Sequence, residues 1–542
     1  AGNLAQLMRP LALRIAMMIV AVATLAAPAQ AYDERPMRLP AVGGPGAAAA
    51  SSQPSTWLIA AEPAGAARAA VLARRFSARK LPTGAVYRVP TARARAFAAA
   101  LREAGALRYA EPDAPLRRQS ALDADPGGYA RGYVVAPGLS PPAPGNVSIA
   151  VVDDLGDVSH PDLAGNTRQL NPGPILAGHG TEVASAAAAL FNGIGVVGVF
   201  PGAPILSVGL PVNIRCSDAA TGILAAANAG AKVINLSFGS TSDCATMFGA
   251  VQIAFAKGSL VVAASGNEFA QGNPVIFPAA YPHVLSVSSL NPDLRSSGFS
   301  SANAAVDVAA PGVAIPVATP AAFDTADGVV DGVTRASGTS FAAPIVSGAA
   351  AWLATARGDL ANGQLADVLR RSARDVPPAG YDRDTGFGLI NLGAALALPA
   401  PARDALEPND GISFVNGSVF ANPDPYVWRG SGQRTLGGTA DKVEDPFDVY
   451  RIRLPRRSRA RIRLRPSFGN PDLYIFRGSA RSIDDDSDIV ARSRNGTLKT
   501  DAVTIRNTSR SARRFYVVIG LGEAGGGLNS TYSLRFQRTK FR

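Results

Sequence analysis

A serine, a histidine and an aspartate can together catalyse the cleavage of acyl bonds. In this chain one residue of each type lies at the end of a predicted helix or strand. Ser340 stands at the start of an Ala-rich helical pattern, His179 starts a second one, and Asp153 ends an apolar run typical of a buried strand. A serine hydroxyl attacks a carbonyl efficiently only when a base takes its proton, and a carboxylate can orient that base. A serine before a helix also serves as an N-cap. The accompanying Asp and His make nucleophilic catalysis the favoured interpretation of Ser340.

These residues lie in sequence blocks that resemble the catalytic domain of subtilisin-like serine proteases, across residues 146–396. The order Asp, His, Ser along the chain is also the order of that family. The resemblance implies an α/β fold with a subtilisin-like parallel sheet flanked by helices. The blocks that carry it are Ala150-Val151-Val152-Asp153, Gly178-His179-Gly180-Thr181, Ala264-Ser265-Gly266-Asn267 and Gly338-Thr339-Ser340 through Pro344.

The resemblance assigns a role to each matching position. Ser340 would attack the scissile carbonyl, His179 would take its proton, and Asp153 would orient His179 and stabilise its charged form. Asn267 matches the side-chain oxyanion donor, and the backbone N–H of Ser340 would be the second donor. Losing one such donor costs about 100- to 1000-fold in turnover, a magnitude known from subtilisin.

Some positions depart from the family pattern without touching this proton path. Asp154 and Leu155 replace the small residue and the glycine that usually follow the aspartate, and Glu182 replaces a second histidine in the His179 block. We therefore expect an altered loop after Asp153 but an active enzyme.

The resemblance also assigns the walls of the pocket for the residue before the cleaved bond, at Ser237-Phe238-Gly239 and Ala264-Ser265-Gly266. These stretches offer backbone edges, so we expect the substrate to bind as an added β-strand. Neither stretch contains an acidic residue, and Ile276 is expected near the pocket floor. These features favour broad specificity or a preference for small and medium apolar residues. A protease restricted to one processing site is the alternative.

The N-terminus carries the pattern of an export signal. Arg9 and Arg14 precede an apolar run from 15 to 27, and Ala29-Gln30-Ala31 matches a signal-peptide cleavage site. We assign the signal peptide to residues 1–31 and expect a secreted, extracellular bacterial protein. No later run reaches about 18 uninterrupted, strongly apolar residues, so no membrane span is expected.

Residues 55–116 predict a small α+β unit ahead of the catalytic blocks. Apolar and Ala-rich patterns predict strands at 57–61, 85–89 and 107–113 and helices at 66–76 and 92–104. The pattern and its Glu111-Pro112-Asp113 ending resemble the propeptide of subtilisin-like proteases, which assists folding and inhibits the enzyme. We assign the propeptide to 32–120, with its inhibitor-like core at 55–116, and the catalytic domain to 121–400. Maturation is expected between Arg117 and Asp125.

Residues 401–542 predict an all-β domain, which follows a linker at 394–403. Period-two alternation between Gly, Pro and Asn clusters indicates the strands of a β-sandwich. Strands are predicted at 448–454, 460–464, 472–476, 515–519 and 532–536. With its Glu407-Pro408-Asn409-Asp410 opening, the region resembles the bacterial pre-peptidase C-terminal domain. Its alternating arginines predict one basic face, which serves either solubility and edge protection or attachment to an anionic surface.

The net charge of +12 is unevenly distributed along the chain. Residues 1–149 and 404–542 are basic, whereas residues 150–400 are acidic. A basic propeptide is attracted to an acidic enzyme, which favours their association and hence inhibition. No nucleic-acid-binding motif accompanies the positive charge, so nucleic acid is not an expected partner. We expect a monomer that acts on proteins or peptides and is inhibited by its own propeptide.

The two cysteines, Cys216 and Cys244, predict one disulfide in an exported chain, with two free thiols as the alternative. The resemblance suggests a structural calcium at Asp162 and Asn192 with nearby carbonyl groups, although the same loop also occurs without metal. The chemistry itself needs no metal or organic cofactor. A catalytically dead binding module would need a broken triad, and an ester hydrolase would normally carry a Gly-x-Ser-x-Gly motif.

Overall fold

The computed structural model describes residues 55–62, 65–82, 84–114, 117–118, 130–326, 328–401, 404, 406–417, 426–441, 445–483, 485–522 and 529–539. The chain divides into two compact units, and the division after the subtilisin-like region falls between Arg403 and Asp404. The predicted signal peptide and residues 119–125 of the predicted maturation segment lie outside the described residues.

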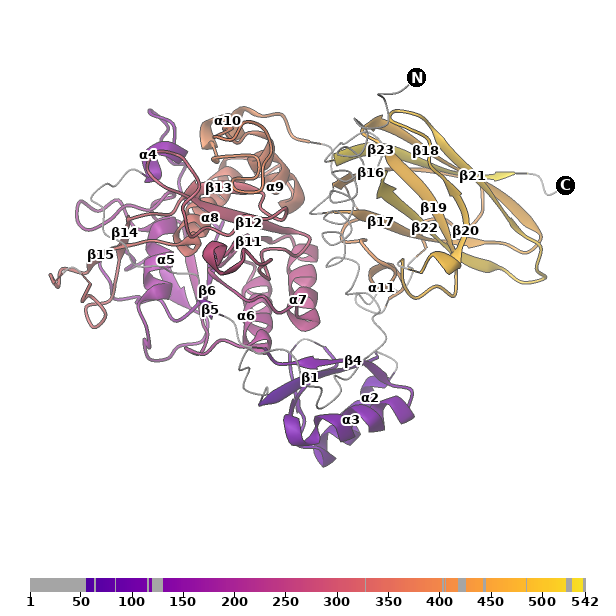
Figure 1. Cartoon of the computed structure of the whole chain (residues 1–542), viewed down its shortest axis with the longest axis horizontal. Coiled ribbons are helices and arrows are strands. Elements are labelled where there is room, and N and C mark those ends of the chain that lie inside the picture. Colours follow the sequence, from indigo (N-terminus) through magenta and orange to yellow (C-terminus); the bar gives the residue numbers. More distant parts are fainter. Residues whose placement is uncertain are drawn as a thin grey trace, which may run out of the picture. The chain divides into compact units, whose positions relative to one another are not determined.

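Residues 55–114, called the N-terminal unit below although they belong to the same compact unit as the parallel sheet, form an antiparallel sheet with two helices on one side of it (Figure 1). Along α3, Ala94, Phe97 and Leu101 recur every three or four residues and are buried, and Phe97 packs edge-on against Tyr87. The strand order is β2-β3-β1-β4. The elements are β1 (Thr56–Ala61), α2 (Ala66–Arg75), β2 (Arg79–Lys80), β3 (Val86–Pro90), α3 (Thr91–Glu103) and β4 (Leu107–Pro112), close to the predicted ones.

The central part is built on a parallel sheet, as predicted. Within the described ranges this sheet has seven strands in the order β13-β12-β11-β9-β6-β8-β7. The inner strands read as continuous apolar runs because both of their faces are buried. The strands are β6 (Ile149–Asp153), β7 (Thr167–Gln169), β8 (Ile205–Gly209), β9 (Val233–Leu236), β11 (Leu260–Ala264), β12 (Val284–Leu290) and β13 (Val308–Pro311).

Helices pack against this sheet in pairs (Figure 1). α5 (His179–Ala188) contacts α8 (Thr339–Ala356), and α6 (Cys216–Asn228) contacts α7 (Ala245–Ala256). Of the described helices, α8 has the length and composition of a membrane span, but 89% of its apolar window is buried inside the fold. Its apolar sequence therefore reflects a core helix. The remaining elements are α4 (Ala130–Val134), β5 (Arg117–Arg118), β10 (Phe238–Gly239), η2 (Phe269–Gln271), β14 (Ile315–Ala318), β15 (Val333–Ala336), α9 (Asn362–Arg371) and α10 (Leu392–Ala397).

The predicted linker at 394–403 is partly wrong, because α10 continues to Ala397. Asn391 caps this helix by accepting the N–H of Ala394 at 3.1 Å, and Leu392 and Ala395 are buried. The Ala-Leu repeat that suggested a linker is thus a short docked helix.

The C-terminal unit consists of antiparallel sheets whose apolar side chains share one core. In the described part of the chain there are two four-stranded sheets, in the orders β16-β23-β18-β21 and β17-β22-β19-β20. Ile462 and Leu534 of one sheet and Ile475 and Val517 of the other belong to the same core, so the unit is a β-sandwich. Its elements are α11 (Ile412–Val415), β16 (Gln433–Asp441), β17 (Phe447–Leu454), β18 (Ser458–Phe468), β19 (Pro471–Arg477), η3 (Asp486–Asp488), β20 (Ile489–Ser493), β21 (Asp501–Asn507), β22 (Arg513–Leu521) and β23 (Asn529–Thr539).

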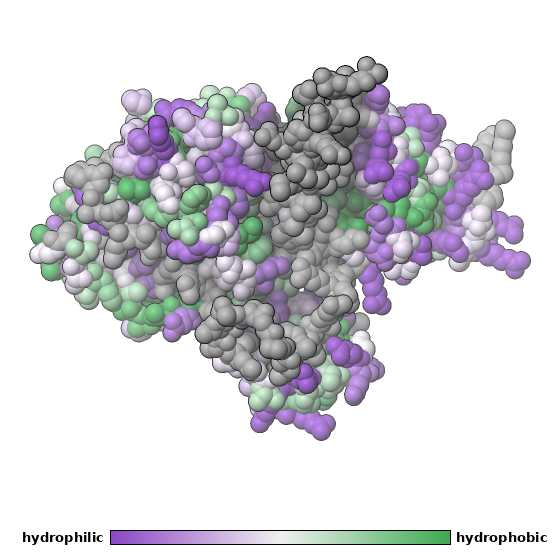
Figure 2. Space-filling view, in the orientation of Figure 1, coloured by the Kyte–Doolittle hydropathy of each residue, from purple (hydrophilic) through white to green (hydrophobic). Residues whose placement is uncertain are grey.

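The sandwich carries the predicted arginine-rich face. Alternate residues of β18 point to solvent, and Arg463 lies opposite Arg535 on β23. Figure 2 shows hydrophilic residues over much of the face of this unit that is in view. The exposed arginines of this face are Arg461, Arg463, Arg465, Arg506 and Arg535.

Candidate active site

The structure brings Asp153 and His179 into direct contact. Nδ1 of His179 lies 2.9 Å from Oδ2 of Asp153, and both side chains are buried. Asp153 ends β6 at the carboxyl edge of the parallel sheet, which is where functional groups gather in such folds. Its other oxygen accepts the backbone N–H of Asp154 at 2.8 Å. The carboxylate is thereby oriented to keep a proton on Nδ1 of His179.

The loop after Asp153 is tied to the first turn of α5, where His179 lies. The Asp154 carboxylate accepts the N–H of Gly180. A Cβ on Gly180 would overlap the carbonyl oxygen of Asp154, so only glycine fits at this close approach. Asp154, which departs from the family pattern, therefore helps to position His179 against Asp153.

Ser340 lies in the first turn of α8, beside His179. Gly338 before it has φ of +145°, a backbone conformation that favours glycine. The His179 ring packs edge-on against Phe341, with the ring centroids 5.6 Å apart. The Ser340 hydroxyl donates to the carbonyl oxygen of Ser237 at 3.0 Å, and Nε2 of His179 has no hydrogen-bond partner among the described residues. The serine–histidine hydrogen bond of the expected triad is therefore not formed in this structure, as is frequent without substrate.

A buried polar network fixes the start of α8. The Ser237 hydroxyl donates to the carbonyl oxygen of Ser340 at 2.8 Å and accepts from Nδ2 of Asn235 at 2.9 Å. Ser347, further along α8, donates to Oδ1 of Asn235 at 3.0 Å. Such fully buried networks specify one arrangement of their elements. Sequence analysis missed Asn235 and Ser347, although polar residues inside apolar runs were a usable signal.

Asn267 is held against the same helix start. Its side-chain oxygen accepts both the N–H and the hydroxyl of Thr339, each at 3.0 Å. These two bonds fix the orientation of the amide, so its NH₂ group faces away from Thr339. The backbone N–H of Ser340 belongs to the first helical turn, whose N–H groups have no partner within the helix. An amide NH₂ and a first-turn N–H are both donors of the kind that suits an oxyanion. Thr339, which the sequence analysis missed, positions Asn267.

The two predicted pocket segments also lie next to each other, since β10 contacts β11. Gly266 has φ of +112°, and a Cβ there would come within 2.6 Å of both Ile276 and the Glu268 carboxylate. Ile276 therefore lies against the pocket segment, as expected. Glu268, which the sequence analysis did not consider, accepts the N–H of Asn267 at 2.7 Å and brings a carboxylate beside this predicted oxyanion donor.

Comparison with known proteins agrees with this geometry. A family model described as the subtilase family matches residues 145–388. Subtilisin BL of Lederbergia lenta is 37% identical to this chain over 261 residues, which cover 46% of the chain and 90% of that protein. The chain belongs to the subtilase family. Members of this family, including the subtilisins, are serine endopeptidases.

Fervidolysin of Fervidobacterium pennivorans is 34% identical over 363 residues, which cover 56% of this chain and 52% of fervidolysin. The sequence match thus spans about half the length of that relative. The crystal structure of fervidolysin, described as a keratinolytic enzyme related to subtilisin, aligns with a TM-score of 0.55 at 19% identity. That alignment covers 88% of this chain and 95% of fervidolysin and shows a shared fold.

Two carboxylates at the end of the N-terminal unit cap helices of the subtilase core. Glu111 accepts the N–H groups of Ala245 and Thr246 at 2.8 and 3.0 Å, at the start of α7. Asp113 accepts the N–H of Ser217 at 3.0 Å, at the start of α6, and pairs with Arg88 at 2.9 Å. First-turn N–H groups carry partial positive charge, so both contacts are electrostatically favourable.

The chain just beyond these caps lies on the predicted substrate strand. Arg117 and Arg118 form β5, which pairs antiparallel with β10, so that Arg118 lies opposite Phe238 and Arg117 opposite Gly239. The residue just before β10 is Ser237, whose carbonyl oxygen accepts the hydrogen bond of the Ser340 hydroxyl. The pairing is the strand addition expected for a substrate.

Cys216 and Cys244 are joined by a disulfide, with their Cα atoms 6.5 Å apart. Cys216 begins α6 and Cys244 caps α7, so the bond links the two helix starts that Asp113 and Glu111 contact. The cross-link therefore holds the surface that receives the N-terminal unit.

Asp162 and Asn192 also lie together. Nδ2 of Asn192 is 3.2 Å from Oδ1 of Asp162, and the N–H of Val196 donates to Oδ2 at 2.9 Å. This loop offers a carboxylate and an amide oxygen, which suit calcium. The calcium assignment at these residues stays a prediction.

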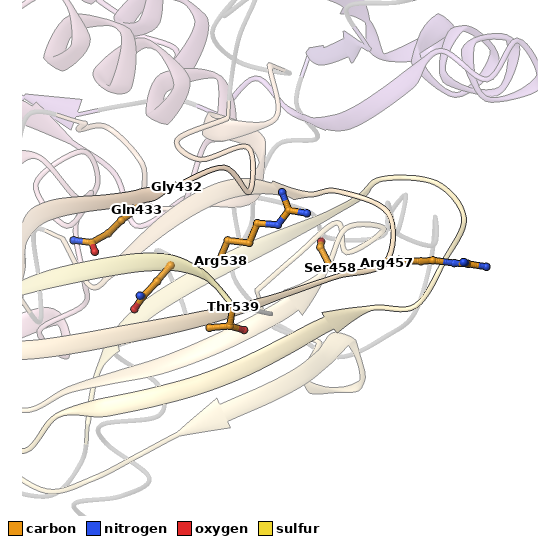
Figure 3. Close-up of a pocket in the computed structure, with 7 residues that line it drawn as sticks. Gly432, Gln433, Arg457, Ser458, Arg538 and Thr539 are labelled. Atoms are coloured by element: carbon orange, nitrogen blue, oxygen red, sulfur yellow. The ribbon is translucent and has the colours of Figure 1, made fainter. Parts of the chain in front are cut away.

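The C-terminal unit has a hollow of about 570 Å³ whose lining includes none of Asp153, His179 and Ser340. Figure 3 shows Gln433 and Arg457 pointing away from each other, so these two side chains do not converge on one point. It is lined by Gly432, Gln433, Arg457, Ser458, Gln537, Arg538 and Thr539.

The charges around His179 determine when it can act as a base. Burial lowers the pKa of His179, but the charge and hydrogen bond of Asp153 and the charges of Glu182 and Asp154 together raise it above its usual 6.5. The neutral imidazole is the form that accepts a proton. Activity should therefore decline as the pH falls through this raised pKa.

We expect Glu182→Gln to move the acidic limb of the kcat/KM profile to lower pH, because the imidazolium then loses a nearby negative charge. The amide can still accept from the Thr319 hydroxyl, which lies 3.1 Å from Glu182. Asp293→Asn, an exposed change of the same charge, serves as the control and should leave the limb in place. A Glu182→Gln profile identical to that of the parent would contradict this electrostatic assignment.

Proposed function

We propose that this chain is a secreted serine endopeptidase that hydrolyses peptide bonds through Asp153, His179 and Ser340. The observation that carries this proposal is the buried Nδ1–Oδ2 contact of His179 and Asp153 beside the start of α8, where Ser340 lies. Family membership supports the same activity.

The proposed reaction proceeds through an acyl-enzyme. The Ser340 hydroxyl first turns from the Ser237 carbonyl toward Nε2 of His179, which takes its proton as Oγ adds to the substrate carbonyl carbon. The resulting oxyanion receives hydrogen bonds from Asn267 and the Ser340 N–H. The imidazolium then protonates the leaving amine as the C–N bond breaks. Water, deprotonated by His179, releases the acyl group by the same steps in reverse order. All of these groups belong to the chain, apart from the water.

We also propose that the chain is made as a proenzyme, with residues 32–120 as an intramolecular chaperone and inhibitor. The support is that Glu111 and Asp113 cap α7 and α6, while β5 pairs with the strand expected to hold substrate. Release would require breaking these contacts, so the uncleaved chain would be inactive. We further propose export directed by residues 1–31, a monomeric mature enzyme, and protein or peptide substrates.

A preference for small or medium apolar residues before the cleaved bond is supported by Ile276 against Gly266. Glu268 beside the same pocket is the feature that would favour a basic residue instead. We expect peptide-library profiling of the mature enzyme to select apolar residues, and casein to be cut at many sites. Strong selection for Arg or Lys, or cleavage of a single-site substrate without casein digestion, would contradict this specificity.

The full chain with Ser340→Ala is expected to keep its propeptide and to leave casein intact, because it lacks the nucleophile. The parent chain should digest casein and begin between Arg118 and Asp125 when its N-terminus is determined by mass spectrometry. If the variant is trimmed like the parent, self-processing is wrong. If the variant digests casein, the assignment of Ser340 is wrong.

We expect Glu111→Gln and Asp113→Asn each to weaken inhibition of the mature enzyme by added propeptide. A helix cap contributes about 0.5–2 kcal/mol, which corresponds to roughly a two- to thirtyfold higher inhibition constant. Glu103→Gln, the same chemical change at an exposed position of α3, is the matched control. Equal inhibition constants for Glu111→Gln and Glu103→Gln would show that the caps do not hold the propeptide.

A further inference from the structure

The C-terminal sandwich contains a cluster of carboxylates that the proposed proteolysis does not use. Asp404, Glu407, Asp445 and Asp448 each offer a carboxylate oxygen, and these oxygens all lie within 4.8 Å of one another. Asp404 and Glu407 come from the segment before α11, whereas Asp445 and Asp448 lie at the start of β17. Two separate parts of the unit therefore meet at this cluster.

Asp445 is buried without compensation. Only 7% of its surface is exposed, and in the described part of the chain its Oδ1 has no hydrogen-bond partner. A buried carboxylate oxygen in this situation destabilises a fold, since it loses its hydration without a hydrogen bond in exchange. One carboxylate oxygen of Asp445 lies within 4.8 Å of an oxygen of each of the other three acids. The cluster therefore offers carboxylate oxygens as ligands for a cation.

The neighbouring Asp448 is held rigidly toward the same point. It is fully buried, and its carboxylate accepts hydrogen bonds from the hydroxyls of Tyr450, at 3.1 Å, and Tyr532. Asp448 is therefore held in place among the other carboxylates of the cluster.

The segment before α11 is itself docked in a defined position. Asp404 accepts the N–H of Thr439 in β16 at 2.9 Å. The backbone and side-chain oxygens of Asn409 accept the N–H of Val449 in β17 at 2.8 and 3.0 Å. The Asn409 contacts hold the segment before α11 against β17 without using the four carboxylates, and Asp404 adds a contact to β16 through its own side chain.

We propose that these four carboxylates form a Ca²⁺ site that fastens the segment before α11 to the sandwich. The donors are all oxygen, which favours a hard cation over zinc or copper. Calcium binds oxygens at about 2.3–2.6 Å, so two of its ligands are at most about 5 Å apart, as found here. Magnesium, at about 2.0–2.1 Å, demands a tighter octahedron and usually keeps several waters.

The test uses the full chain with Ser340→Ala, so that proteolysis does not interfere. Calcium should raise the unfolding temperature of the C-terminal unit relative to EDTA, because an ion that binds only the folded state stabilises it. Asp445→Asn should bind calcium about tenfold more weakly or not at all. In EDTA this variant should unfold at the same or a higher temperature than its parent, since it no longer buries an uncompensated carboxylate. If Asp445 had only a structural role, replacing it would instead lower the unfolding temperature both in calcium and in EDTA.

Two controls separate this site from others. Asp162→Asn removes a ligand of the calcium site predicted in the catalytic domain, and it should keep the calcium response of the C-terminal unit. Asp486→Asn changes an exposed acid of the sandwich and should behave as the parent does. If Asp445→Asn does not fold, Asp404→Asn replaces it, with the same loss of calcium binding expected.

Terbium gives a second readout because Tyr450 and Tyr532 adjoin the cluster. Excitation of tyrosine should produce terbium emission that calcium competes away and that Asp445→Asn lacks. The proposal is overturned if calcium leaves the unfolding of the C-terminal unit unchanged, or if Asp445→Asn retains the full calcium response. It is also overturned if only lower pH stabilises the unit, since protons would then neutralise the cluster.

Discussion

The buried contact between His179 and Asp153 is the constraint on which the arrangement of the catalytic unit depends. A carboxylate with no exposed surface is costly unless donors and a chargeable partner surround it. Asp153 obtains them from the loop that follows it and from the first turn of α5. β6, this loop and α5 must therefore meet at the carboxyl edge of the sheet. α8 brings Ser340 to the same place, with Phe341 against the imidazole.

Helix starts carry most of the remaining chemistry in this unit. α8 presents Ser340 and its N–H, while α6 and α7 direct their first N–H groups to Asp113 and Glu111. First-turn N–H groups are unsatisfied within a helix and lie at its positive end. The unpaired N–H groups that suit an oxyanion at the start of α8 therefore also suit the carboxylates at the starts of α6 and α7. Glu111 and Asp113, at the end of the N-terminal unit, are the residues that make these contacts.

The sequence predicted well those features that depend on a local pattern, such as the ends of helices and strands. It predicted poorly the features that depend on contacts between distant segments. β6 and α8 are continuous apolar runs bounded by chemistry-bearing residues, so their ends and the positions of Asp153 and Ser340 could be read directly. Asn235 and Thr339 escaped because their roles arise only when β9 and β11 pack under α8. β16 escaped because its central Gly437-Gly438 interrupts the alternation, and pairing with β23 supplies what the pattern lacks.

Asp153 and Asp445 are buried and Glu111 is part-buried, and the different surroundings of these three carboxylates bear on their roles. Asp153 faces an imidazole, and Glu111 faces the N–H groups of a helix start, so each has a protein partner that offsets the lost hydration. Asp445 has no such partner for its Oδ1 within the described residues, and its nearest charged neighbours are other acids. Selection for stability alone would favour an amide or an apolar side chain there. Keeping a carboxylate at that position is favourable only where a cation completes the surroundings that the fold leaves unfinished.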